Sequence, residues 1–411
     1  MKNLSLNRYM IIEWLVLAIA FLIPFMPKVL NILIGLLALL VITDSGFRKR
    51  LPTIFSNRIA LASIILYLVY VLGMAWSVNM QYGWLDLQIK FSLLVFPILF
   101  GGIGNHPGLS YRKIFIVFSL GCLTALVICL LRAAYNYSES GIDGFFYQKL
   151  SYFIHPGYFA MYLNFGIYFL IHEIVFTEKL TDQRWRILLF PIIIFLIGGL
   201  LLLSSKAGIM ILLLTLLATI VFLITRRQPW KILIALILIL TGALMITIFT
   251  PEISKRWSEM SNTISGTLEE TQGHTTGLRL KVWEGAIKLI QDKPWFGVGT
   301  GDVKDELVKK YEELKLMEPA VMRLNAHNQF LQTTVTLGIF GVAILLLLLF
   351  YSFIYFVRSR NYLALSFLVI VAFNAMIESI LEVQAGAIFF AFFLGIFIWI
   401  QNDKKMAVPD L

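Results

Sequence analysis

The stretch RLKVWEGAIKLIQDKPWFGVGTGD, residues 279–302, lies in the one long polar segment of this sequence, which runs from Pro251 to Gly341. Apolar spans flank this segment on both sides. It also contains NAHNQ, residues 325–329, so a basic residue stands near its beginning and a histidine near its end. A segment this rich in hydrogen-bond donors, set between apolar spans, indicates chemistry on an anionic substrate at a membrane surface.

Composition excludes a chain of soluble domains. Of the 411 residues, 59% are hydrophobic and 14% are charged, and the mean hydropathy is +0.83. The net charge of +10 does not indicate a nucleic-acid partner, because lysine and arginine are spread over short loops between apolar spans. The two cysteines, Cys122 and Cys129, lie about 10 Å apart along one predicted helix and cannot bridge each other.

A helix needs about twenty apolar residues to cross a bilayer, so the apolar runs can be counted as spans. The predicted spans lie near residues 9–27, 29–44, 58–78, 90–104, 112–134, 156–176, 186–205, 207–225, 231–250, 333–357, 361–381 and 383–401. We therefore predict an all-α polytopic membrane protein with about 12 transmembrane helices. Its parts are residues 1–250 with spans one to nine, residues 251–332 as a large periplasmic loop, and residues 333–411 with the last three spans and a short cytoplasmic tail.

The distribution of basic residues predicts the orientation in the membrane. Alternate short loops hold pairs or clusters of lysine and arginine: Arg48, Lys49, Arg50, Arg58, Arg112, Lys113, Lys179, Arg184, Arg186, Arg226, Arg227, Arg358, Arg360, Lys404 and Lys405. Such loops are cytoplasmic in most membrane proteins. Both termini are then cytoplasmic, and the segment from Pro251 to His327 lies on the outer side.

Three amphipathic segments are expected on that outer side. Residues 279–291 carry apolar Val282, Ala286, Ile287 and Ile290 at helical spacing. A second helix is expected from Asp302, as N-cap, to about Leu316, with one apolar stripe of Val303, Leu307, Tyr311 and Leu314. The segment Ser77–Lys90 is predicted to lie as a helix in the membrane interface. The stretch Asn262–Thr276 is predicted to be a mobile loop.

Three cationic or titratable side chains converge on the outer side in this topology. Lys206 stands at the turn between the seventh and eighth spans, where an ionisable residue either serves function or extends to the lipid head groups. Arg279 can hold a phosphate bidentately while it stacks on Trp283, four residues later; an ordinary surface cation–π pair is the other reading. His327 can accept a proton from a hydroxyl near pH 7, although a histidine at the start of a helix is often structural.

Other polar residues near these three have weaker claims. Asn328 is expected to bind substrate beside His327. Glu378 and Glu382, four apart at the outer end of the eleventh span, are expected to share a helix face and either pair with Arg279 or Lys206 or bind an acceptor sugar. His155 is a further candidate. The run Gly297–Gly301 lacks the ending of a phosphate-binding P-loop, which favours a plain turn.

Several of these motifs resemble those of one family. The pattern Arg279-x-x-x-Trp283, then Pro294 and Gly297-Val298-Gly299, then Asn325-x-His327-Asn328-Gln329 and Gly338-x-x-Gly341, resembles the O-antigen ligase and O-antigen polymerase superfamily. The ending Glu378-x-x-x-Glu382-x-Gln384-x-Gly386 looks like that of the ligase-related branch. The predicted architecture, with one large external loop after the ninth span, also resembles this family and is GT-C-like.

The resemblance implies a metal-independent glycosyltransferase without a cofactor, located in the bacterial inner membrane with its site facing the periplasm. Its donor would be a glycan on undecaprenyl pyrophosphate, and its acceptor a hydroxyl of lipid A–core or of another glycan. Arg279 and Lys206 would engage the pyrophosphate, and His327 would be the base; the family commonly has arginine where this sequence has Lys206. A polymerase of the same family is the close alternative. A transporter of lipid-linked sugars is a less favoured alternative. It would have charged residues at mid-membrane and paired repeats, whereas the candidate residues here cluster on one side of the membrane and no repeat is visible.

Overall fold

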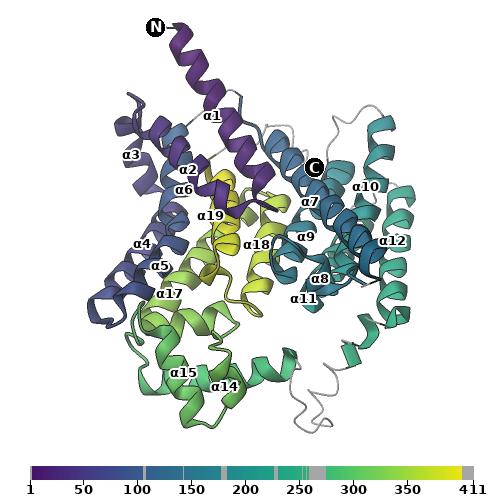
Figure 1. The fold of residues 1–411 in the computed structure, drawn as a ribbon. Coiled ribbons are helices and arrows are strands. Elements are labelled where there is room, and N and C mark those ends of the chain that lie inside the picture. Colours follow the sequence, from purple (N-terminus) through teal and green to yellow (C-terminus); the bar gives the residue numbers. More distant parts are fainter. Residues whose placement is uncertain are drawn as a thin grey trace.

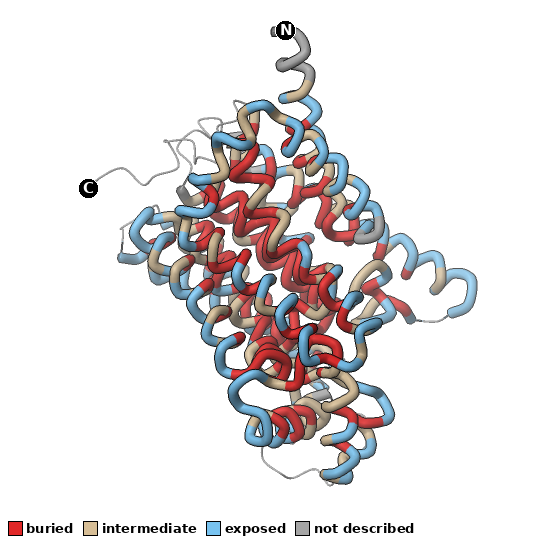
Figure 2. The backbone as a smooth tube through the Cα atoms, turned by 90° about the vertical axis from the view of Figure 1, so that its left-hand side faces the viewer, coloured by how far each residue is buried: buried red, intermediate tan, exposed pale blue. Residues whose placement is uncertain are grey.

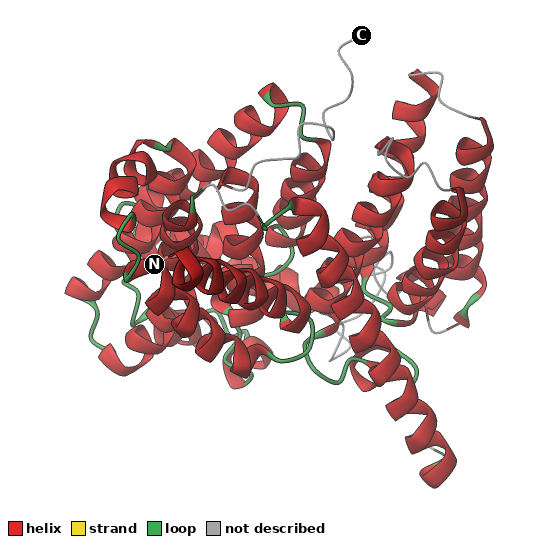
Figure 3. Ribbon diagram, turned by 90° about the horizontal axis from the view of Figure 1, so that it is seen from above, coloured by secondary structure: helices red, strands yellow, loops and turns green. Residues whose placement is uncertain are grey.

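The computed structural model is built from helices and loops, and the part of the chain that it describes contains no strand (Figure 3). It describes residues 2–104, 108–141, 143–176, 183–225, 230–251, 253–255, 257–258 and 275–399. The predicted mobile loop Asn262–Thr276 lies almost wholly outside these ranges, as do Lys179, Arg226, Arg227, Lys404 and Lys405.

The helices before the polar segment form most of the membrane bundle. They are α1 (Lys2–Leu22), α2 (Pro27–Ile42), α3 (Phe47–Ser56), α4 (Arg58–Leu72), η1 (Gly73–Trp76), α5 (Met80–Lys90), α6 (Ser92–Ile103), α7 (Tyr111–Ser140), α8 (Tyr147–Leu150), α9 (Pro156–Phe176), α10 (Gln183–Leu202), α11 (Lys206–Thr225) and α12 (Trp230–Phe249). The polar segment holds α14 (Thr275–Asp292), α15 (Val303–Glu313) and α16 (Met317–Val321). The chain then continues through α17 (Gln329–Arg358), α18 (Tyr362–Ala375), η2 (Ile380–Glu382) and α19 (Gln384–Trp399).

Each of the predicted apolar runs falls on a helix, but twelve spans are not established. Among the described residues seven helices are long and apolar enough to cross a membrane, and the bent pair Val29–Ile42 and Phe47–Ser56 would make an eighth. Three more apolar helices are shorter: Leu188–Leu202, Tyr362–Ala375 and Gln384–Trp399. The chain is therefore a multi-pass membrane protein in composition and helix length.

The core of the bundle surrounds α19. Every residue of this helix from Ala385 to Ile398 is buried, as expected for a helix that is apolar on all sides. Its phenylalanines interlock with those of α7, α9 and α18; Phe393, for example, lies 4.8 Å from Phe118 and 5.0 Å from Phe165 between ring centroids. Figure 2 shows the buried backbone in the middle of the bundle and the exposed positions around it. The connection that leads into α19 packs into this core through Ile380 and Leu381, which are buried.

The polar segment folds as a small helical layer at one end of the bundle, opposite α3 and the beginning of α1 (Figure 1). Helices α14 and α15 share a hydrophobic cluster with the start of α17, which includes Val282, Ala286, Leu307 and Tyr311. The predicted stripe of α15 is confirmed at Val303, Leu307 and Tyr311, which are buried, whereas Leu314 follows the last helical residue and is half-buried. In α14 the prediction was wrong for Ile287, whose side chain is exposed.

Asp302 does not cap its own helix as predicted. Its side chain makes no capping bond to α15; instead, its carboxylate accepts hydrogen bonds from the backbone of Val78 and Asn79 at 2.7–3.0 Å. Asn79 is the N-cap of α5, so the carboxylate ties the loop to the start of that helix. The outer layer is thereby fastened to the bundle.

The predicted interfacial helix Ser77–Lys90 is also different in the structure. Helices α5 and α6 together form one candidate span, Met80–Ile103. Asp86 and Lys90 are buried rather than facing water, because they pair with each other and with Glu382 of η2. A local periodicity of aromatic residues could not reveal a partner 292 residues away.

Candidate active site

Arg279 and Lys206 meet at the first turns of two helices. Lys206 begins α11, and its Nζ donates a hydrogen bond to Oγ1 of Thr276 at 3.0 Å. Thr276 and Arg279 are three residues apart in α14 and therefore lie on the same face of that helix. The outer turn before α11 and the start of the loop helix thus bring two cations to one place.

Glu378 joins these cations to the predicted base. Its carboxylate forms an ion pair with Nη2 of Arg279 through Oε1, and Oε2 lies 2.9 Å from Nδ1 of His327. The side chain of Glu378 is only 12% exposed. A single buried carboxylate therefore holds both Arg279 and His327.

Glu378 is not on a helix with Glu382, as the spacing predicted. Helix α18 ends at Ala375, and the chain turns before the short helix η2 begins at Ile380. The two carboxylates consequently point to different partners: Glu378 to Arg279 and His327, and Glu382 to Lys90. The predicted pairing of Glu378 with Arg279 is present.

His327 is held by its neighbours in an unusual backbone conformation. Its φ is +42°, in the left-handed region, which costs a residue with a side chain about 1–2 kcal/mol. Oδ1 of Asn325 accepts a hydrogen bond from the backbone N–H of His327 at 3.0 Å. On the other side, the backbone N–H of Asn328 donates to Oγ of Ser379 at 3.2 Å. These bonds hold the backbone from which the imidazole projects.

The charge on Glu378 determines which nitrogen of His327 carries the proton. Burial alone would raise the pKa of Glu378, but the hydrogen bond from His327 and the positive charge of Arg279 outweigh burial and place this pKa below its ordinary value. An ionised carboxylate can only accept, so Nδ1 of His327 must donate to it. In the neutral imidazole, Nε2 then carries the lone pair that can take a proton.

Glu378, Arg279 and Lys206 line a small cavity of about 30 Å³, which His327 adjoins through its bond to Glu378. The lining residues are Tyr147, His155, Gly157, Ser205, Lys206, Ala207, Arg279, Asn374 and Glu378. Nε of Arg279 is buried and has no hydrogen-bond partner among the described residues, so the guanidinium keeps a donor beyond the one used by Glu378. The arrangement can therefore bind a further anion next to an oriented imidazole.

A family model described as O-antigen ligase matches residues 191–346. This region contains Lys206 and Arg279, which line the cavity, and His327, which is bonded to the lining residue Glu378. This part of the chain, somewhat more than a third of its length, is similar to the O-antigen ligase family.

The O-antigen ligase match does not include Glu378 or Glu382, which lie beyond its end. A curated relative, an uncharacterized protein of Haemophilus influenzae, is 33% identical over 135 residues, which is 32% of this chain. The aligned part covers 34% of the relative, so the chain spans about a third of that protein's length.

Two other predicted site residues, Asn328 and Trp283, make contacts within the protein. Asn328 is the N-cap of α17: Oδ1 accepts from the backbone of Phe330 and Leu331, and Nδ2 donates to the carbonyl of Met376 at 3.0 Å. Trp283 packs against the cluster shared by α14 and α15, and its Nε1 is buried without a hydrogen-bond partner among the described residues. Neither residue lines the cavity around Glu378.

The run Gly297–Gly301 is a turn that hydrogen-bonds to α17 where that helix is interrupted. Helix α17 is interrupted at Gly338, whose φ is +66°, and a Cβ there would lie 2.0 Å from the carbonyl oxygen of Trp295. The N–H groups of Val298 and Gly299 donate to Val335 and Thr336 of that helix, both at 2.9 Å. These donors are already used inside the protein, so the run is no phosphate cradle.

The cavity also contains residues that sequence reasoning ranked low or missed. His155 was a minor candidate, and Asn374 and Tyr147 were not considered. Asn374 is buried in α18, where a lone amide within an apolar span was an available signal. Tyr147 gave none. Among the described residues no group of three or more His, Cys, Asp or Glu side chains is placed to hold a metal ion.

Proposed function

We propose that this protein is a metal-independent glycosyltransferase that moves a glycan from undecaprenyl pyrophosphate to an acceptor hydroxyl. The single observation that carries this proposal is the position of Glu378, which holds His327 and Arg279 beside Lys206. A base and two cations at one place are the groups that glycosyl transfer from a pyrophosphate requires. The family match supports the same class of reaction.

In the proposed step, Nε2 of His327 takes the proton of the acceptor hydroxyl as its oxygen attacks the anomeric carbon of the donor. A bond forms between that oxygen and the anomeric carbon, and the bond from this carbon to the pyrophosphate oxygen breaks. Undecaprenyl pyrophosphate leaves with the electron pair. Glu378 keeps Nδ1 protonated and stabilises the imidazolium, as the carboxylate does in other histidine–carboxylate pairs.

Arg279 and Lys206 are proposed to bind the pyrophosphate. The guanidinium fork of Arg279 can hold two phosphate oxygens, and Lys206 adds a point charge. Charge that grows on the leaving group is then stabilised by fixed cations, so we expect chelators to leave the rate unchanged. The cavity of about 30 Å³ must widen to admit a pyrophosphate.

The proposed site faces the periplasm of a bacterial inner membrane, because the basic residues of the short loops indicate cytoplasmic loops on the other side. A reporter enzyme fused after Asn262 should read periplasmic, and one fused after Arg358 cytoplasmic. A cytoplasmic reading at Asn262 would place the site on the wrong side for a periplasmic acceptor.

The ligase reaction, with lipid A–core as acceptor, is the version that the ending Glu378-x-x-x-Glu382 favours. A polymerase would use the same residues, with another lipid-linked repeat as acceptor. The test is transfer by the purified full-length protein in lipid nanodiscs, from lipid-linked glycan to lipid A–core or to a second lipid-linked glycan. Product with only the first acceptor supports a ligase, and product with only the second supports a polymerase. Absence of product with both, from folded protein, would contradict the proposal.

A further inference from the structure

A second, larger cavity lies on the other side of the His327 segment. Its volume is about 490 Å³, within the usual range for sites that bind small molecules. We propose that this polar cavity binds sugar residues of one of the two substrates. This inference rests on the proposed function and adds to it a glycan site that none of the residues around Glu378 provides.

The lining of the polar cavity matches the chemistry of sugars. The residues on which the argument depends are Tyr82, Gln88, Asn325, Gln332, Glu382 and Gln384. Amides both donate and accept, and a carboxylate accepts, so together they complement hydroxyl groups that also do both. Tyr82 supplies a flat apolar surface with a polar tip. Asn325, Gln332 and Gln384 each make one hydrogen bond within the protein, but a hydrocarbon chain would offer no partner to the remaining donors and acceptors of the lining, which disfavours a lipid tail as the occupant.

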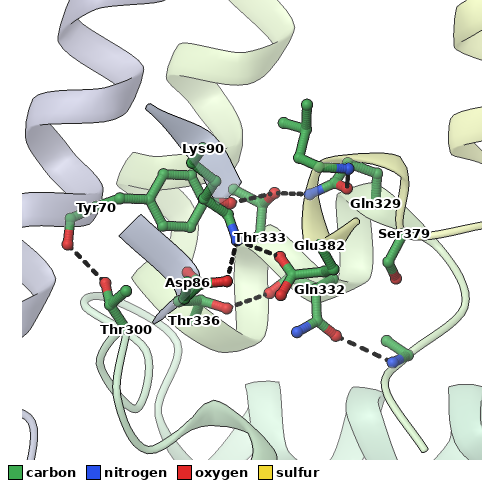
Figure 4. A network of polar contacts seen from close by, with 12 residues as sticks. Tyr70, Asp86, Lys90, Thr300, Gln329, Gln332, Thr333, Thr336, Ser379 and Glu382 are labelled. Atoms are coloured by element: carbon green, nitrogen blue, oxygen red, sulfur yellow. Dashed lines mark hydrogen bonds and ion pairs between the residues drawn. The ribbon is translucent and has the colours of Figure 1, made fainter. Parts of the chain in front are cut away.

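The carboxylate of Glu382 is held in a fixed position from behind. Nζ of Lys90 lies 2.7 Å from its Oε1 and also pairs with Asp86 (Figure 4). The side chains of Lys90, Asp86 and Glu382 are 0%, 2% and 5% exposed. Because the ion cluster is buried, Glu382 cannot swing away, and the acceptor atom that borders the cavity is pre-positioned.

The cations at the edge of the cavity do not indicate an anionic ligand. Arg323 lines the cavity, but its Nη2 is paired with Asp305 at 2.6 Å. Nζ of Lys304 lies 5.9 Å from the ring centroid of Tyr82. With one of the two cations paired and the amides in the majority, a neutral or weakly charged saccharide fits the lining best.

The polar cavity shares a wall with the catalytic histidine. Asn325 lines the cavity and accepts the backbone hydrogen bond of His327 at 3.0 Å. Gln332 also lines it, and its Oε1 accepts from the backbone of Ala326 at 3.0 Å. A sugar bound in the cavity would therefore contact the same residues that hold the backbone of the His327 segment.

The experiment compares two glutamines of α5. Gln88 lines the polar cavity; Gln81, two helical turns earlier, is exposed and does not. In the full-length protein in nanodiscs, Gln88→Leu should raise KM for one substrate, the lipid-linked donor or the acceptor, by about 3- to 10-fold, the effect of one lost hydrogen bond. Gln81→Leu should leave both KM values unchanged.

A second variant fills the polar cavity. Leu85→Trp places a large side chain at its lining and should raise the same KM by about 10-fold or more. Leu68→Trp, on an exposed face of α4, is its control and should leave both KM values unchanged.

A binding readout separates this inference from the proposed function. Oligosaccharides released from the donor and from the acceptor by mild acid are tested with each variant by saturation-transfer NMR. A rise in donor KM identifies the donor glycan, and a rise in acceptor KM the acceptor glycan; either supports the inference. Transfer with both KM values unchanged in Gln88→Leu and Leu85→Trp would overturn it and leave the proposed function intact. Saccharide binding lost in both variants, in a protein that performs no transfer, would retain the glycan site and overturn the proposed function.

Discussion

The connection between α18 and α19 carries two glutamates into different electrostatic surroundings. Glu378 reaches a small cavity at the outer end of the bundle, where its partner Arg279 is 24% exposed and its partner His327 is 29% exposed. Glu382, four residues later, enters the interior, where its partner Lys90 is fully buried and also holds Asp86. The first cluster has two cations near one carboxylate and a histidine; the second has two carboxylates around one cation.

The side chains around Glu378 can exchange their bonding partners when a substrate binds, whereas those around Lys90 cannot. Arg279 and His327 are partly accessible, so a substrate can replace or share their bonds to Glu378. Lys90 is enclosed, and any loss of its charge leaves carboxylates buried without compensation. We infer that the cluster around Glu378 acts in the chemistry and that the cluster around Lys90 holds the outer end of the bundle in shape.

The largest expected effect follows from breaking the enclosed cluster. Lys90→Met should lower the free energy of unfolding by about 3–5 kcal/mol, because Asp86 and Glu382 would remain buried without a cation. The measurement is thermal unfolding in detergent, followed by intrinsic fluorescence. Lys288→Met, at an exposed position of α14, is the matched control and should unfold like the wild type. Equal unfolding temperatures for both variants would show that the buried cluster contributes no stability.

A smaller effect is expected from changing the geometry of the accessible cation. Arg279→Lys keeps the charge but loses the fork that can hold Glu378 and a phosphate together, so the transfer rate should fall by about 10- to 100-fold. The variant should unfold within a few degrees of the wild type. Near-normal transfer by Arg279→Lys and by Arg279→Ala alike, in folded protein, would exclude a phosphate-binding role for this residue.

The pKa of Glu378 predicts a modest dependence of stability on pH. A carboxyl whose pKa is lowered by folding contributes stability that is fully present above its ordinary pKa and is lost as the pH falls through the lowered value. Wild type should therefore unfold a few degrees above Glu378→Gln at pH 7, and this difference should vanish in acid below the ordinary glutamate range. A difference that grows on acidification would mean that Glu378 is protonated in the folded protein.

The smallest effect is expected at Lys206. The lysine supplies a charge without a fixed geometry, so Lys206→Arg should retain transfer within about threefold of the wild type. Steady-state rates with saturating acceptor and varied donor provide the measurement. A loss as large as that of Arg279→Lys would indicate that the contact between Lys206 and Thr276 itself positions α14.

Local pattern was sufficient to predict the helices and insufficient to predict the buried ion cluster. Apolar runs predicted the membrane helices, and a stripe of Val303, Leu307 and Tyr311 predicted the buried face of α15, because burial of one helix face follows from residue spacing. The pairing of Glu378 with Arg279 was one of the alternatives that residue types allowed. Lys90 was misplaced at the membrane surface, because its role depends on Glu382, which only long-range packing brings near.

The orientation of His327 could not be predicted either. Its nitrogen roles depend on Glu378, and Glu378 reaches it only because α18 stops at Ala375 and the chain turns there. The spacing of Glu378 and Glu382 gave the opposite expectation, one continuous helix face. The sequence indicated His327 as a candidate base, and the structure shows that Glu378 is its carboxylate partner.

The most direct test of the account is the transfer rate of His327→Ala, with binding of the lipid-linked donor measured separately in the same nanodiscs. If His327 takes the acceptor proton, transfer should fall by about 10²- to 10⁴-fold, while donor binding through Arg279 and Lys206 persists within a few-fold. Full turnover by His327→Ala, or a loss of donor binding as large as the loss of turnover, would contradict the account and direct the search for the base to His155 or Glu378, which line the same cavity.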